Sequence, residues 1–134
     1  MTDPDVALND LAFFALDHAM DSVVASGGPL VPFAVTEKDG ARSLARFVGD
    51  LEQGQRDARA SVASAGAIDR AAVAWDGYLT VDGTRVDAVF AEASQVGSTE
   101  SLLLAQRYHA TGRIRKRIEP VGNPALLPPG SPLF

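Results

Sequence analysis

The chain contains no cysteine, and this absence removes several classes of chemistry at once. Disulfide bonds, thiolate nucleophiles and zinc or iron–sulfur sites with cysteine ligands are all excluded. Only two histidines are present, His18 and His109, so one chain cannot build a histidine-rich metal centre. We therefore expect no bound metal and no cofactor.

Long apolar runs are also absent, since no stretch reaches the roughly 18 residues that a bilayer-spanning helix needs. Residues 1–25 carry five aspartates and neither Lys nor Arg, whereas a secretory signal peptide begins with a basic region. We expect no membrane association and a cytoplasmic location. The net charge of −5 also disfavours nucleic acid as a partner, because phosphate binding needs a basic surface.

The composition that is present is typical of an ordinary globular protein, with 134 residues, an apolar fraction of 46% and a charged fraction of 22%. Arg outnumbers Lys ten to two, which we interpret as the codon bias of a high-GC bacterium. We expect residues 1–119 to form a single domain and residues 120–134 to form a Pro-rich, apolar C-terminal arm.

The clearest structural signal is a β-hairpin over residues 72–92 that turns at Asp82–Gly83. An Asp-Gly pair suits a type I′ turn, which needs positive φ at both central residues. Counting outward from the turn places Trp75 opposite Phe90, and the face that carries this pair is apolar until Glu92. The hairpin therefore predicts which side chains of this segment belong to the core.

Acidic residues around this hairpin raise the possibility of a nuclease-like metal site. Such a site places an acid and then an acid-x-Lys sequence on neighbouring strands, to hold Mg²⁺ and activate water. Glu92 is followed by Ala93 and Ser94, so the lysine is missing. We therefore interpret Asp76, Asp87 and Glu92 as solvated surface residues.

Shorter signals predict the rest of the fold. We expect helices over residues 4–25 and 51–65, and strands over residues 30–36, 42–48, 102–109 and 113–119. Short turns between consecutive strands indicate an antiparallel sheet. The prediction is an α+β fold with about five or six strands, the order α-β-β-α-β-β-β(-β), and two helices packed mainly on one face.

This element order resembles that of roadblock and profilin-like domains, which act as dimerisation or docking platforms. At the level of residues, the segment Pro32–Ala34, the turn at Asp39–Gly40 and the segment Val86–Val89 resemble small uncharacterised bacterial α+β proteins. The resemblance spans roughly residues 25–110. It implies a fold of this kind and assigns no catalytic residues.

Catalytic patterns are absent from the sequence. The chain has no Gly-x-Ser-x-Gly element, no Gly-x-Gly-x-x-Gly motif and no P-loop. Nothing links a serine to a histidine and an acid as a catalytic triad requires. We predict no catalytic residues, and the sequence favours a protein that is not an enzyme.

Positive charge gathers near the end of the chain, where a strand would place Arg113, Arg115 and Arg117 on one face, with Tyr108 beside Arg115. Guanidinium groups next to an aromatic ring can bind an anion or a base. Two other interpretations stay open: protection of a sheet edge by charge, and pairing with the acidic residues 1–40 in the same chain or another subunit. The candidate ligand-binding residues are Arg107, Tyr108, His109, Arg113, Arg115 and Arg117.

Two segments carry more large apolar side chains than the core of one small domain needs. The helix over residues 4–25 is apolar on more than one side, and the C-terminal arm holds large side chains whose burial is worth roughly 1.5–3 kcal/mol each. We interpret both as parts of a homodimer or partner interface, with self-packing or disorder as alternatives. The candidate interface residues are Phe13, Leu16, Met20, Leu126, Leu127, Leu133 and Phe134.

The leading hypothesis is therefore a non-enzymatic dimerising or docking module. The alternative is a small protein that binds an anionic ligand or nucleotide through the Arg113–Arg117 strand, with or without hydrolytic activity.

Overall fold

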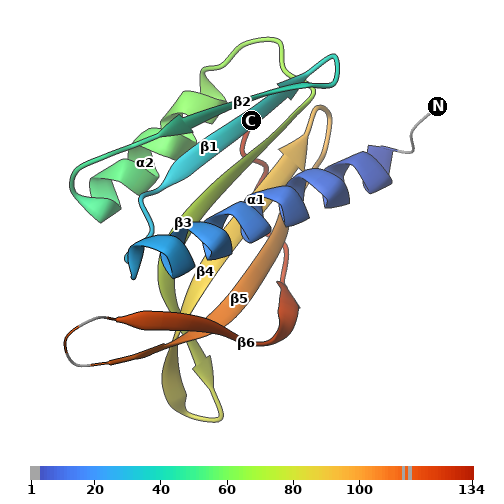
Figure 1. Cartoon of the computed structure of the whole chain (residues 1–134). Helices are drawn as coiled ribbons and strands as arrows, with labels where there is room; N and C mark the ends of the chain where they lie inside the picture. The colour runs from blue at the N-terminus through green and yellow to red at the C-terminus, as the bar shows by residue number, and fades with distance from the viewer. Residues whose placement is uncertain (1–3, 113, 115) are drawn as a thin grey trace.

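Two helices and six strands make up the part of the chain that the computed structural model describes, which is residues 4–112, 114 and 116–134 (Figure 1). In chain order the elements are α1 (Pro4–Ser26), β1 (Phe33–Lys38), β2 (Ala41–Arg46), α2 (Leu51–Ala63), β3 (Arg70–Val81), β4 (Thr84–Gln95), β5 (Leu102–Thr111) and β6 (Arg117–Leu127). The strands form one antiparallel sheet in the order β2-β1-β3-β4-β5-β6. The predicted α+β fold and its element order are confirmed.

The β3–β4 hairpin has the register that its turn predicts. Asp82 and Gly83 have φ angles of 50° and 76°, as a type I′ turn requires. Trp75 lies opposite Phe90, and their rings stack with centroids 5.4 Å apart. This hairpin forms the centre of the sheet, and the other strands are added on either side of it.

The two helices lie on opposite faces of the sheet, so the expectation that both pack mainly on one face is wrong (Figure 1). α1 packs on the face that carries Phe33, and α2 packs on the face that carries Ala34. Neighbouring residues of a strand point to opposite faces, so β1 contributes to two cores. The reason is visible at residues 71–74 of β3, which are all apolar and all buried, as in a strand covered on both sides.

β6 extends the sheet beyond Glu119. The strand runs over Arg117–Leu127, so residues 120–127 of the expected C-terminal arm belong to the edge strand. Pro120 and Pro124 are tolerated there because an edge strand forms ladder hydrogen bonds on one side only. The final residues, 128–134, have neither helical nor strand structure.

Gly54 shows how closely α2 approaches the chain around it. A Cβ atom at this position would lie 2.7 Å from the Phe47 carbonyl oxygen and 3.3 Å from Pro32 Cγ. Helix propensity alone favours Gly54→Ala by about 1 kcal/mol, whereas overpacking costs about 1–3 kcal/mol. We expect Gly54→Ala to lower the free energy of unfolding by about 1–2 kcal/mol in urea titrations.

A matched control lies in the same helix. Ala63 is exposed, so Ala63→Gly should also destabilise, by up to about 1 kcal/mol, through propensity alone. Thus glycine is favoured at position 54 and alanine at position 63. A stabilising Gly54→Ala would show that α2 does not approach the Phe47 carbonyl this closely.

Candidate functional site

Residues 128–134, which we call the tail segment, return to the α2 side of the sheet after β6. The Ser101 amide donates a hydrogen bond to the Gly130 carbonyl at 2.9 Å, and the Gly130 amide donates to Ser101 Oγ at 3.1 Å. The Leu133 amide donates to Ser94 Oγ at 3.0 Å. The tail segment is therefore held at two points through its main chain.

The side chains of Leu133 and Phe134 pack against an apolar floor between α2 and the sheet. We call this floor, together with Ser94 and Ser101, the tail-docking surface; its apolar members are Ala34, Ala58, Val62, Ala71 and Val73. All five are Ala or Val, and they lie in β1, β3 and α2. Small side chains leave room between helix and sheet, and Leu133 and Phe134 occupy it.

Glu92 lies beneath the tail segment and is 6% exposed, so its expected position at the surface is wrong. One carboxylate oxygen lies 2.8 Å from Arg59 Nη2 of α2, and the other accepts a hydrogen bond from Ser101 Oγ at 2.5 Å. The Arg59 guanidinium in turn lies 4.7 Å from the centre of the Trp75 ring. The burial follows from register, because Glu92 is opposite Val73 on the face that α2 covers.

Asp76 is also not a free surface acid. It lies on the α1 side, where it accepts hydrogen bonds from the Leu30 amide at 2.8 Å and from the Tyr108 hydroxyl at 2.7 Å. Burial, followed by the hydrogen bond and the negative charge of Asp76, strongly raises the pKa of Tyr108. Tyr108 therefore stays a neutral donor that ties β5 to β3.

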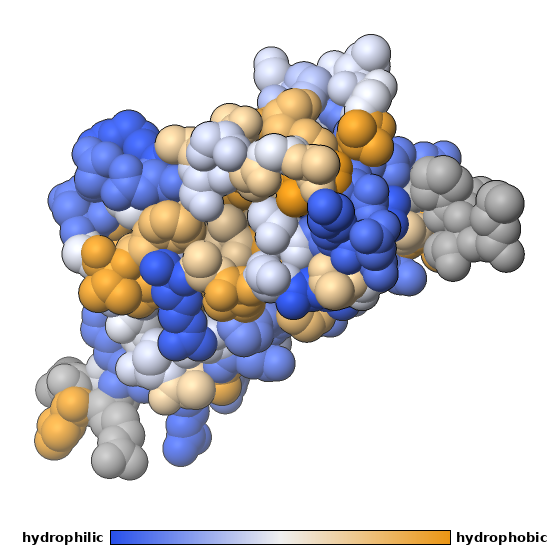
Figure 2. Space-filling model, turned by 90° about the horizontal axis from the view of Figure 1, so that it is seen from above, coloured by the Kyte–Doolittle hydropathy of each residue, from blue (hydrophilic) through white to orange (hydrophobic). Residues whose placement is uncertain are grey.

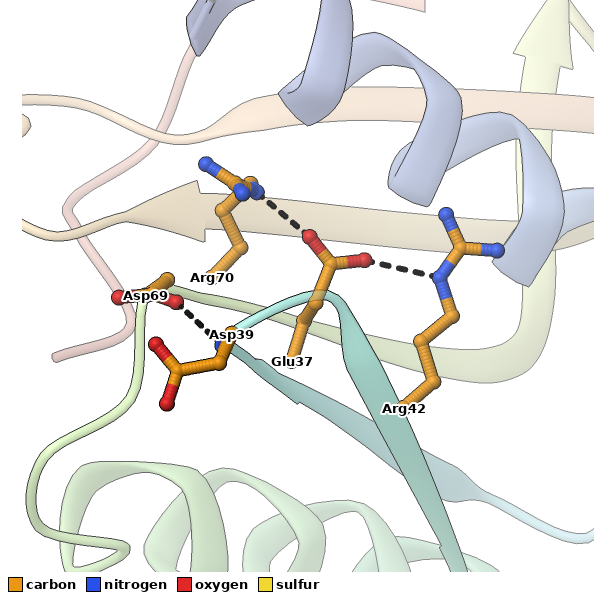
Figure 3. Close-up of polar contacts among 5 residues, drawn as sticks. All are labelled: Glu37, Asp39, Arg42, Asp69 and Arg70. Carbon is orange, nitrogen blue, oxygen red and sulfur yellow. Dashed lines mark hydrogen bonds and ion pairs between the residues drawn. The ribbon is translucent and has the colours of Figure 1, made fainter. Parts of the chain in front are cut away.

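A second buried acid, Glu37, lies between two arginines at one end of the sheet (Figure 3). Its carboxylate oxygens accept hydrogen bonds from Arg42 Nε at 2.9 Å and from Arg70 Nε at 2.8 Å. Both arginines are its direct neighbours across the β1–β2 and β1–β3 ladders. Beside this group, the Asp39 amide donates to Asp69 Oδ2 at 2.8 Å.

The electrostatics of Glu37 follow from these contacts. Burial alone would raise the pKa of Glu37, but the hydrogen bonds and charges of Arg42 and Arg70 outweigh it, and the pKa lies below its ordinary value. The Arg42 guanidinium also lies 4.7 Å from the centre of the Phe14 ring. The Glu37 carboxylate thus links three strands and, through Arg42, the outer side of α1.

His18 of α1 is held by aromatic packing, with ring centroids 6.1 Å from Phe14 and 5.1 Å from Phe33. Among the residues described, none forms a hydrogen bond with its buried Nε2.

The residues expected to bind an anion can be placed only where the structure describes them. Arg113 and Arg115 lie outside the described residues. Arg117 lines a hollow of about 730 Å³ beside the last turn of α1. The C-terminal end of a helix carries partial negative charge, so a cation here complements α1.

The other candidates of this set lie on different faces. Tyr108 lies opposite Pro120 rather than residue 115, and it is buried on the α1 side. Arg107 lies opposite Ala88, which belongs to the other face. His109 is exposed and lines a hollow of about 410 Å³ together with Tyr108, Tyr78, Arg85 and Asp87. The structure thus brings Tyr108 and His109 to one hollow, and Arg107 is not part of its lining.

The candidate interface residues also divide. Leu16 and Met20 belong to the α1 core, whereas Phe13 is 43% and Leu126 is 69% exposed. Leu127, Leu133 and Phe134 are partly buried against clusters of their own chain. In the view from above, hydrophobic residues gather in the middle of the visible face of the molecule, between hydrophilic ones (Figure 2).

The comparisons with known proteins add no relative: no family model, no curated protein and no solved structure matches the chain. Within the described ranges, neither helix is long and apolar enough to cross a bilayer. In the same residues, no three side chains of His, Asp or Glu are grouped as a metal site. The function must therefore be argued from the geometry of the surface under the tail segment.

Sequence reasoning did not identify Arg59, Ser94, Ser101 and Gly130 as residues that come together, and it placed Glu92 at the surface. One signal was available. Glu92 falls on the apolar face of the hairpin, where an acid must find a partner because an unpaired buried charge is costly. The partner, Arg59, is 33 residues away, and no local pattern identifies it.

Proposed function

We propose that the protein is a non-enzymatic docking module that binds an apolar peptide segment on the tail-docking surface. The observation that carries this proposal is the tail segment itself, which occupies the surface within the same chain. Its amides bond to Ser94 and Ser101, and Leu133 and Phe134 pack on the apolar floor.

The contacts have the form that peptide-binding surfaces use. In these surfaces, hydrogen bonds to the main chain of the peptide supply affinity for any segment that can adopt the same backbone conformation, and apolar contacts select particular side chains. Ser94 and Ser101 bond to backbone amides of the tail segment. A segment from another molecule could form the same bonds.

The chemistry of the buried acids supports binding over catalysis. Both carboxylate oxygens of Glu37 accept hydrogen bonds from arginines, and both oxygens of Glu92 are engaged by Arg59 and Ser101. A general base needs a free lone pair within reach of a substrate proton. Glu37 and Glu92 are each only 6% exposed, so burial keeps both carboxylates away from a substrate at the surface.

A direct test uses the full chain with Leu133→Asp and Phe134→Asp, which we call the opened variant, and a fluorescent peptide of residues 128–134. Because the intramolecular tail acts at an effective concentration of millimolar order, we expect wild type to bind the peptide at least about tenfold more weakly than the opened variant. Fluorescence anisotropy measures this. A folded opened variant that does not bind the peptide would refute the proposal.

Exchange of tail segments between two copies would also produce the homodimer that the sequence suggests. Each copy would then place its Leu133 and Phe134 on the tail-docking surface of the other. Light scattering over a range of concentrations tests this extension. If tails are exchanged, wild type forms dimers as its concentration rises and the opened variant stays monomeric. A wild type that is monomeric at every concentration would contradict tail exchange, and docking would then involve only other partners.

A further inference from the structure

At Gly130 the tail segment closely approaches Glu92 and Ser101. We infer that the tail-docking surface selects segments with glycine at this position, in the pattern Gly-x-x-aliphatic-aromatic, and that Glu92, Arg59 and Ser101 impose this choice. The inference rests on the proposed docking function and specifies which partners it accepts.

Glycine is needed at position 130 for space. A Cβ atom there would lie 2.7 Å from Glu92 Oε2 and 3.1 Å from Ser101 Oγ. Gly130 is not among the glycines with positive φ, so its backbone conformation is open to other residues. An added methyl group is therefore excluded by the two oxygen atoms and not by backbone strain.

Glu92 cannot easily move aside, although its carboxylate is the end of a flexible side chain. One oxygen is paired with Arg59 Nη2 at 2.8 Å and the other with Ser101 Oγ at 2.5 Å. Arg59 is itself placed over Trp75. Displacing the carboxylate would separate Glu92, whose side chain is 8% exposed, from Arg59, whose side chain is 37% exposed, and this loss of a charged partner is unfavourable.

Glu92 also orients the hydroxyl group that recognises the segment. Ser101 Oγ donates its only proton to Glu92, so its lone pairs are left to accept the hydrogen bond from the Gly130 amide. The same oxygen thus bonds to the backbone at position 130 and restricts the side chain there. Glu92 acts as a positioning residue for Ser101.

The remaining contacts set the spacing of the pattern. The amide of residue 130 bonds to Ser101 and the amide of residue 133 bonds to Ser94. With both fixed, the side chains at positions 133 and 134 reach the apolar floor. Ser131 is exposed, so the surface should tolerate changes at that position.

The experiment measures binding of three peptides to the opened variant: residues 128–134 as they stand, the same peptide with Gly130→Ala, and a control with Ser131→Ala. We expect the Gly130→Ala peptide to bind at least about tenfold more weakly, and the Ser131→Ala peptide to bind within about twofold of the original. Equal binding of all three would overturn the inference and leave docking intact. Binding by none of them would overturn both.

A second measurement assigns the effect to Glu92. In the opened variant with Glu92→Ala added, the penalty for the Gly130→Ala peptide should fall from about tenfold to less than about threefold, because the obstructing carboxylate is gone. An unchanged penalty would show that Glu92 does not impose the choice. If this variant does not fold, the test uses Gly130→Ala in the otherwise wild-type chain, which should weaken the docking of its own tail segment and increase binding of the unchanged peptide. Ser131→Ala in the same background should not increase binding. Equal peptide binding by these two variants would contradict the inference.

Discussion

Replacing both Leu133 and Phe134 by aspartate lowers the free energy of unfolding by about 2–4 kcal/mol in urea titrations, because two partly buried apolar side chains leave the floor between α2 and the sheet. Full burial of each would be worth about 1.5–3 kcal/mol, and partial burial reduces that sum. The domain should remain folded, since the α1 core on the opposite face contributes no residue to this surface.

The matched control is Leu126→Asp, at a side chain that is 69% exposed in β6. A surface change of this kind should alter the free energy of unfolding by no more than about 0.5 kcal/mol. If the double replacement costs no more than Leu126→Asp, then Leu133 and Phe134 are not docked in solution. That result would remove the basis for the tail-docking surface.

Replacing Glu37 by glutamine lowers the free energy of unfolding at pH 7 by about 2–3 kcal/mol, since Arg42 and Arg70 both lose their ionised partner. The estimate is below the cost of breaking a fully buried pair because the arginine side chains are 36% and 20% exposed. Glu119→Gln, at an exposed position, provides the control and should have little effect.

The difference in the free energy of unfolding between wild type and Glu37→Gln depends on pH in a defined direction. The pKa of Glu37 is lowered in the folded state, so its ionised form stabilises the fold above the unfolded pKa of about 4.3. This stabilisation is lost as the pH falls through the lower, folded pKa. The difference between wild type and Glu37→Gln should therefore shrink on acidification from pH 7 to about pH 3. A difference that stays constant or grows would contradict the ion-pair account.

The sequence predicted the parts of the fold that depend on local patterns. The Asp82–Gly83 turn determines the register of β3 and β4 because the side-chain period of a strand is two, so one turn orders the whole hairpin. The Asp50 side chain caps α2 at its predicted start by accepting a hydrogen bond from the Gln53 amide at 2.9 Å. In both cases the interacting residues are close in sequence.

The placement of α2 could not be predicted in this way. A short helix rich in alanine can pack on either face of a sheet, and the face is decided by which strand residues it meets. β1 and β3 carry apolar residues on both faces, so their patterns fit either choice. Ala34 and Val73 meet α2, whereas Phe33 and Ala72 meet the α1 core.

The candidate site was missed for a related reason. These residues come from different parts of the chain: Arg59 from α2, Glu92 from β4, Ser101 from the loop just before β5, and Gly130 from the tail segment. Apart from Glu92 on the apolar face of the hairpin, none of these residues stands out in its own segment, and only the tertiary fold brings them together. The basic residues near the end of the chain formed a pattern in the sequence, but Arg107 and Tyr108 point to opposite faces because they are neighbours in one strand.

The most direct measurement is the map of backbone amide chemical shifts when the peptide of residues 128–134 is added to the opened variant. The account predicts shifts at Val62, Val73, Ser94 and Ser101, with the α1 residues Phe13 and Asp17 unchanged. Shifts confined to α1, or no shifts at saturating peptide, would contradict the claim that this surface is a docking site.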